Sequence, residues 1–190
     1  STTFAGVPSL GKDMIDVAGI RRTDGSRLLA TNIPKKSVEY IQALEASGLN
    51  IVGMTAVPEF ASGLESELHG QTHNPWNLDY SCIASSSGAA AAVAAGYVPL
   101  AHGTDGGGSN RLPSHACGLF GFKPSRLRML SGESNGGHDK FKTNNAISRT
   151  VRDSAALFDA TEDKSNQVYA HIGYVSGPTK RRLRIAYAPD

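Results

Sequence analysis

The sequence has few cysteines, little net charge and no long hydrophobic run, and each shortage argues against a class of protein. Its 190 residues include 2 cysteines, Cys82 and Cys117, which form no disulfide framework and favour a reducing, cytoplasmic setting. The formal net charge is +2, and the one basic cluster, 180–184, is more simply a solvated loop than a nucleic-acid surface. No apolar run approaches the roughly 20 residues of a membrane-spanning helix. We therefore expect neither a membrane nor a nucleic-acid partner.

Glycine, by contrast, is abundant. It accounts for 21 of 190 residues, about 11%, against a usual level of roughly 7%. Many of these glycines fall between Gly88 and Gly121, interleaved with alanine and apolar residues, which indicates tight packing. The chain begins at Ser1 on an apolar segment, so we expect that upstream sequence is missing.

Hydrophobic periodicity predicts alternating strands and helices. Strands are expected over 4–10, 49–54, 97–102, 119–122 and 183–188, and helices over 38–46, 89–95 and 150–158. Ser37 and Gly48 are expected to bound the first of these helices. A turn is expected at 74–77 and a long loop over 130–143. The alternation indicates an α/β layered core without an internal domain boundary.

The most informative segment is the glycine-rich run 103–109, GTDGGGS. Three consecutive glycines expose backbone N–H groups, and such a run can form a nest that binds negative charge. Beside a carbonyl under attack, these donors would stabilise an oxyanion, and Ser109 would stand next to them. A serine hydroxyl needs a base to act as a nucleophile. Judged alone, the loop is equally compatible with a tight structural turn.

Spacing excludes two other glycine-loop functions. A phosphate-binding loop needs Gly-Lys-Ser/Thr, and no lysine follows here. A dinucleotide fingerprint starting from Gly106 and Gly108 would need a third glycine at the position of Arg111.

Other polar residues are weak candidates when each is judged alone. Ser85 and Ser86 precede an Ala-rich run, where serines more often cap a helix. Lys12 could act as a base only if burial lowered its pKa. His69 and His73 have a helical spacing, but Gly70 and a following Asn-Pro argue against a zinc-binding helix, so no metal site is expected.

Taken together, these motifs resemble those of amidase-signature enzymes. The run 82–124 resembles the family's signature segment, with a Ser-Ser-Gly stretch, an Ala-rich helix, GTDGGGSNRLP and CGLFGFKPS. FAGVPSLGKDM resembles its lysine segment, HNPWN its Asn-Pro turn, and IVGMTAVPEFASG a strand and loop. The resemblance covers most of residues 4–160. Several ordered, well-separated matches are far more specific than any one of them.

The resemblance implies a Ser-Ser-Lys triad. In it Lys12 corresponds to the base, Ser85 to a bridging serine that follows a cis peptide, and Ser109 to the nucleophile. The implied oxyanion donors are the backbone N–H groups of Gly106, Gly107, Gly108 and Ser109. Asp105, Arg111 and Ser86 would support the site, which needs no cofactor and no metal.

The implied fold is a mixed β-sheet core covered by helices on both sides. The implied activity is hydrolysis of a small-molecule carboxylic amide through an acyl-enzyme on Ser109. Two alternatives stay open: the amidase subunit of a glutamine-dependent tRNA amidotransferase, and a non-catalytic homologue that acts as an interaction protein. Family members are longer, so residues 1–190 would be one amidase-signature domain without its N- and C-terminal portions. Association with the rest of its own chain, or with a second copy, is then expected.

The chain departs from the family pattern near the implied triad. The family usually has two glycines before Ser85 and one after Ser86, where this chain has Ile83, Ala84 and Ser87. Met54-Thr55-Ala56 stands where Lys-Thr-Asn is common, so a charge and an amide are lost. Because the three triad positions are unchanged, we expect these differences to tune activity, with an impaired homologue as the alternative.

Overall fold

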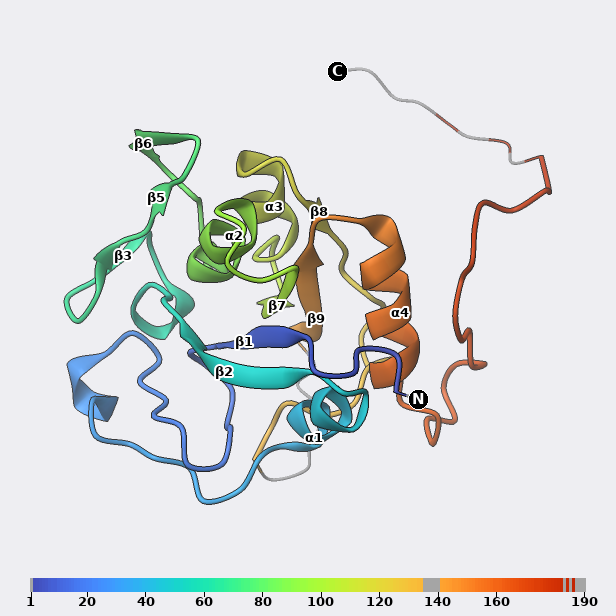
Figure 1. The fold of residues 1–190 in the computed structure, drawn as a ribbon, viewed down its shortest axis with the longest axis horizontal. Helices are drawn as coiled ribbons and strands as arrows, with labels where there is room; N and C mark the ends of the chain where they lie inside the picture. Colours follow the sequence, from blue (N-terminus) through green and yellow to red (C-terminus); the bar gives the residue numbers. More distant parts are fainter. Residues whose placement is uncertain (1, 135–140, 183, 185, 187–190) are drawn as a thin grey trace.

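The structure is a computed structural model that describes residues 2–134, 141–182, 184 and 186. Figure 1 shows the described elements packed together, with a C-terminal segment that runs away from them. In chain order the elements are β1 (Pro8–Lys12), η1 (Arg27–Leu29), α1 (Glu39–Ala46), β2 (Asn50–Thr55), η2 (Glu59–Ala61), β3 (Glu65–Ser66), β4 (Gly70–Gln71), β5 (His73–Asn74), β6 (Asn77–Ser81), α2 (Ser87–Ala94), β7 (Leu100–Asp105), α3 (Arg111–Ala116), β8 (Phe120–Gly121), β9 (Thr143–Ser148) and α4 (Val151–Thr161).

Two groups of strands form the centre of the fold. β1 pairs with β2 in parallel, whereas β9 pairs antiparallel with both β7 and β8. β1 and β7 are in contact, and Ser9 Oγ donates to the Leu100 carbonyl at 3.0 Å. The strand arrangement is therefore mixed, as predicted.

Apolar side chains cover both faces of these strands. Leu100 and Ala146 belong to one cluster, with residues of α1 and α4, whereas the adjacent Ala101 and Ile147 belong to another, with residues of α2. Successive residues of a strand point to opposite faces. The predicted class, an α/β core with helices on both sides, is therefore confirmed.

Short side chains let α2 approach the strands closely. A Cβ added at Gly88 would lie 2.5 Å from the Ala56 backbone nitrogen, and the Gly88 N–H donates to the Ala56 carbonyl at 3.1 Å. Only glycine fits such a backbone contact. The expected tight packing of the Ala-rich helix is confirmed.

Two predicted strands begin and end later than expected. The strand expected over 4–10 is β1, and it starts at Pro8 because Phe4 lies in a turn whose N–H bonds the Ser47 carbonyl. The strand expected over 97–102 is β7, which continues to Asp105 because Thr143 of β9 pairs with that residue. Lys12 thus ends a strand, and the glycine loop begins at Gly106.

Other predictions around the helices are confirmed or wrong. The helix expected over 150–158 is α4, which starts one residue later, after its cap Thr150, and continues to Thr161. Gly48, in the left-handed region at a φ of 97°, follows the end of α1 as expected. Ser37 does not cap α1; its Oγ accepts from Ala18 N at 3.0 Å instead. β9 and α3 were not predicted. Most of the strand expected over 183–188 lies outside the described residues.

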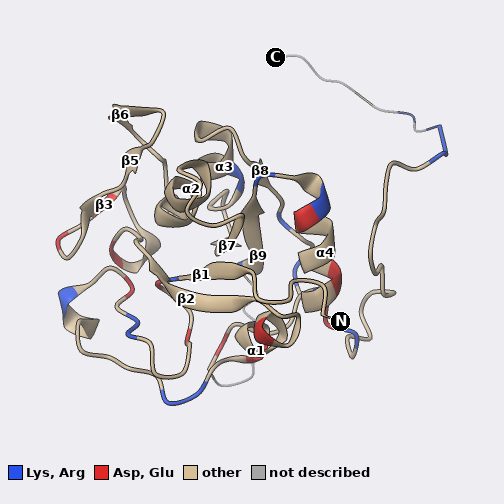
Figure 2. Ribbon diagram, in the orientation of Figure 1, with Lys and Arg blue, Asp and Glu red and all other residues tan. Residues whose placement is uncertain are grey.

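Charged residues of both signs are distributed along the ribbon over several elements and loops (Figure 2). Within the part of the chain that the structure describes, no helix combines the length and the apolar character needed to cross a membrane.

Candidate active site

Lys12 ends β1 with its side chain fully buried, at 0% exposure. Its Nζ lies 2.7 Å from Ser85 Oγ and 2.8 Å from Thr104 Oγ1. Burial, and to a smaller extent the charge of Lys142, lower the pKa of Lys12 from 10.5 to about 7, against the opposing effect of Asp105 and Asp24. The neutral amine is therefore well populated at neutral pH and can accept a proton.

Ser85 reaches Lys12 from the segment that precedes α2. The Ala84–Ser85 peptide is cis, as the resemblance implies. Ile83 has a φ of 60°, in the left-handed region that a β-branched residue rarely occupies. A glycine would adopt that conformation without strain, which gives a physical reason for the family's glycine at this position.

Ser86 joins the start of α2 to the glycine loop. Its backbone N–H donates to the Ser109 carbonyl at 3.2 Å, and its Oγ lies 3.3 Å from both Asn110 Oδ1 and the Thr104 carbonyl. These bonds bring the Ser85 and Ser109 segments together although they are 24 residues apart in the sequence. Ser109 itself is half-buried in front of α3.

Asp105 and Arg111 fix the loop on either side of Ser109. Arg111 Nε and Nη2 lie 2.8 and 3.0 Å from the two Asp105 carboxylate oxygens. Burial alone would raise the pKa of Asp105, but bonds from Arg111 and from backbone N–H groups lower it to about 2. One of those N–H groups is that of Gly108, at 2.7 Å, so this predicted oxyanion donor is already engaged.

His102 and Thr104 are two site residues that the sequence analysis missed. Both are buried on β7, where His102 Nδ1 accepts from the Lys12 backbone N–H at 3.1 Å. Their two-residue spacing puts both side chains on one face of β7, but no local pattern marked that face as part of the site.

A cavity of about 340 Å³ lies at the ends of β1 and β2, where Asp13, the residue after Lys12, forms part of its wall. It is lined by Asp13, Ile20, Arg21, Thr23, Met54, Thr55, Ala56 and His69. Met54 and Ala56, where the family commonly has lysine and asparagine, therefore face open space. Their replacement changes the charge of a cavity wall and leaves the Lys12–Ser85 contact in place.

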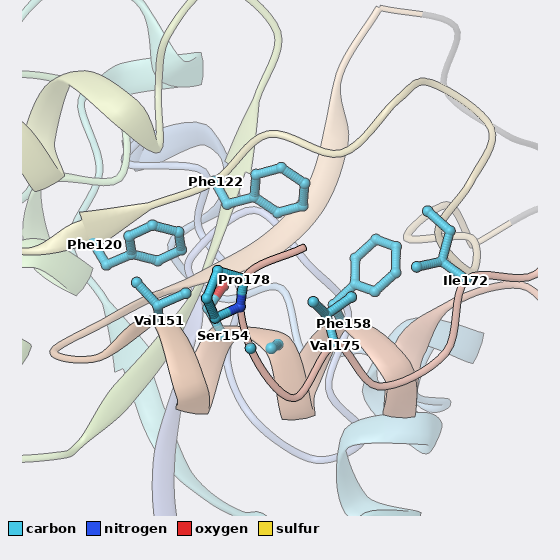
Figure 3. A pocket seen from close by; sticks show the side chains of 10 residues that line it. Phe120, Phe122, Val151, Ser154, Phe158, Ile172, Val175 and Pro178 are labelled. Atoms are coloured by element: carbon cyan, nitrogen blue, oxygen red, sulfur yellow. The ribbon is translucent and has the colours of Figure 1, made fainter. Parts of the chain in front are cut away.

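A larger apolar groove, of about 520 Å³, lies between β8, α4 and the segment 172–178 (Figure 3). None of Lys12, Ser85 and Ser109 lines it. It is lined by Phe120, Phe122, Val151, Ser154, Ala155, Phe158, Ile172, Val175, Gly177 and Pro178.

Known proteins are similar to this chain in sequence and in fold. The Amidase family model matches residues 1–190. AmiC of Mycobacterium tuberculosis is 41% identical over 187 residues, which are 96% of this chain and 40% of AmiC. The chain thus spans about 40% of the length of this curated relative.

Solved structures agree. A 6-aminohexanoate cyclic dimer hydrolase is 34% identical with a TM-score of 0.80, over 94% of this chain and 38% of that one. A glutamyl-tRNA(Gln) amidotransferase chain from Thermotoga maritima is 31% identical with a TM-score of 0.78, over 90% of this chain and 39% of that one. By sequence and by fold, the chain belongs to the Amidase family.

Proposed function

We propose that this chain carries the nucleophile and base of an enzyme that hydrolyses a carboxylic amide, with Lys12, Ser85 and Ser109 as its catalytic triad. The observation that carries the proposal is the buried Lys12 amine, 2.7 Å from Ser85 Oγ and with its pKa lowered to about 7. A buried amine is costly to keep charged, and a neutral amine beside a hydroxyl can accept its proton as a general base.

The first half of the reaction forms an acyl-enzyme. Neutral Lys12 takes the hydroxyl proton of Ser85, and Ser85 in turn takes the hydroxyl proton of Ser109. At the same time Ser109 Oγ forms a bond to the amide carbon. The oxyanion is stabilised by backbone N–H groups of Gly106, Gly107 and Ser109, each worth about 3–4 kcal/mol. We leave Gly108 out of this set because its N–H donates to Asp105.

The second half releases the products. The C–N bond breaks as Lys12 returns its proton through Ser85 to the leaving amine. Water then gives a proton to the same relay and attacks the acyl carbon. The Ser109 ester bond breaks as the relay returns that proton to Ser109 Oγ, which releases the carboxylic acid. The relay ends in its starting protonation state, so no cofactor is consumed.

The experiment is serine labelling combined with turnover in the full-length protein that contains this chain. A fluorophosphonate probe is expected to label Ser109, and Ser109→Ala is expected to lose both labelling and amide hydrolysis with an unchanged circular dichroism spectrum. The exposed Ser125, changed to alanine, is the matched control and should keep both. Turnover retained by Ser109→Ala would refute the assignment.

A tRNA amidotransferase component is the second candidate, supported by the 31% identity to the Thermotoga maritima amidotransferase chain. Glutaminase activity together with a co-purifying second protein would favour it over a free-standing amidase. Absence of labelling at Ser109 in the full-length protein would favour the third candidate, a non-catalytic interaction protein.

We propose a small-molecule amide as substrate and a reducing, cytoplasmic setting for the protein. The free, buried thiols of Cys82 and Cys117 support the second point. The exposed apolar groove supports association with the remainder of a longer chain, and a homodimer is the competing occupant. The molar mass of the full-length protein by light scattering separates these two occupants.

A further inference from the structure

β1 and β7 lie side by side but belong to different hydrogen-bonded sheets. Side chains connect them instead. Ser9 Oγ bonds the Leu100 carbonyl at one end of β1, and the Lys12 backbone N–H donates to His102 Nδ1 at the other. A buried backbone N–H needs an acceptor, and at Lys12 the imidazole supplies it.

The His102 ring is held in one state by its partners. Because Nδ1 accepts from Lys12, the ring hydrogen is on Nε2, which lies 3.3 Å from Asn144 Oδ1 on β9. The side chain is buried, and the Tyr40 ring covers it at 5.3 Å between centroids. Burial lowers the pKa of His102 to about 3, so the ring stays neutral at neutral pH. A protonated ring would carry a hydrogen on Nδ1, which would point at the Lys12 backbone N–H, so two donors would face each other.

One face of β7 contacts both the backbone nitrogen and the side-chain amine of Lys12. His102 and Thr104 are two apart, so they share that face. His102 holds the backbone nitrogen and Thr104 Oγ1 holds the amine, at 2.8 Å from Nζ. The charged groups that act on the amine are Lys142, Asp105 and Asp24.

We propose that His102 is a positioning residue for Lys12. Its neutral imidazole, oriented by Asn144, holds the end of β1 so that the Lys12 amine stays buried against Ser85. This inference rests on the proposed function, because it assigns His102 a role only if Lys12 is the base.

Loss of the imidazole acceptor has a defined consequence. The Lys12 N–H would be buried without an acceptor, so the end of β1 would move to find one. The amine would then lie farther from Ser85 and nearer to water, which raises its pKa. Lower kcat and an acid limb displaced to higher pH follow, whereas KM changes little because the imidazole does not contact substrate.

His102→Leu and Asn144→Leu in the full-length protein test the proposal, with Ser9→Ala as the matched control. Ser9→Ala removes a different side-chain link between β1 and β7, the bond to the Leu100 carbonyl, and leaves both contacts of Lys12 with β7 in place. His102→Leu should lower kcat roughly 10- to 100-fold, with KM within about twofold. Its acid limb should move upward by about half a pH unit or more. Asn144→Leu frees the ring hydrogen to move to Nδ1, so it should shift the limb in the same direction with a loss of roughly 3- to 10-fold.

A kcat and an acid limb equal to those of Ser9→Ala in both leucine variants would overturn the proposal. If His102→Leu does not fold, Asn144→Leu decides by the same comparison. Failure of the proposed function looks different, because the unmodified protein would then show neither labelling at Ser109 nor turnover. A labelled, active protein whose two variants match the control refutes only the role of His102.

Discussion

The polar cluster around Lys12 is completed by contacts among the 190 residues, whereas the apolar groove beside α4 is left open. Lys12, Ser85, Thr104 and His102 are buried and each contacts another member of the cluster. The groove is formed by β8, α4 and the segment 172–178, and the side chains that line it are mostly apolar (Figure 3).

Under the proposed function, this difference distinguishes residues that set the rate from residues that bind a partner. Buried polar groups must be paired, so their positions are specified by direction as well as by distance. Apolar contact has no preferred direction, so a groove wall can change with little effect on the fold. We therefore expect changes in the polar cluster to act on rate, and changes in the groove to act on what the groove binds.

The largest effect should come from Lys12→Met, which removes the proton acceptor but keeps a side chain of similar length. We expect kcat to fall roughly 10³-fold or more, while the unfolding midpoint changes too little to explain that loss. Lys123→Met is the control, since Lys123 Nζ donates to the Pro124 carbonyl, and it should stay near full activity. Recovery of Lys12→Met simply by raising the pH would contradict the role of Lys12.

The next effect concerns pH. The pKa of Lys12 is lowered to about 7, and only the neutral amine can accept a proton. The rate should therefore rise with pH through about 7 and be roughly 100-fold lower two units below that value. A profile of kcat between pH 5 and 9 measures this, and a flat profile would argue against a lysine base.

A smaller effect is expected from Asp105→Asn, because the amide cannot replace the ion pair with Arg111. We expect a loss of about 2 kcal/mol in the free energy of unfolding. The carboxylate's pKa is lowered to about 2 from 3.8, so its contribution is present above pH 4 and declines as the pH falls from 4 to 2. Urea midpoints across this range should fall in the unmodified protein and change less in Asp105→Asn.

The smallest effect should come from Ile172→Ser in the groove, where the isoleucine is 52% exposed. In residues 1–190 alone the free energy of unfolding should change by less than about 0.5 kcal/mol. If the rest of a longer chain covers the groove, the same change should cost about 1–2 kcal/mol there. Equal, small effects in both proteins would leave the groove free for a ligand or a second copy.

Sequence alone predicted the elements that carry strong local signals. The helix at 38–46 and the strand after it have regular apolar spacing, and the structure has them at Glu39–Ala46 and Asn50–Thr55. β9 was missed because its residues, TNNAIS, are largely polar and its burial comes from neighbouring strands and helices. Tertiary pairing also extended β7 into the segment predicted as loop.

The candidate site divides in the same way. Lys12, Ser85 and Ser109 came from motif resemblance. Lys12 Nζ contacts Ser85 Oγ from a segment 73 residues away, and the Ser86 N–H donates to the Ser109 carbonyl. His102, by contrast, contacts a backbone N–H 90 residues away, and no local pattern encodes such a contact. The bond between Gly108 and Asp105 is likewise a matter of loop geometry that composition cannot supply.

The complete burial of Lys12 has a thermodynamic consequence for the unfolded chain. Between pH 7 and 10.5 the amine is protonated when the chain is unfolded and largely neutral once it is folded. Folding in this range therefore releases a proton to solvent, and the folded state gains stability as the pH rises. Formation of the fold itself thus generates the free base, and calorimetry in buffers of different ionisation enthalpy would register that proton.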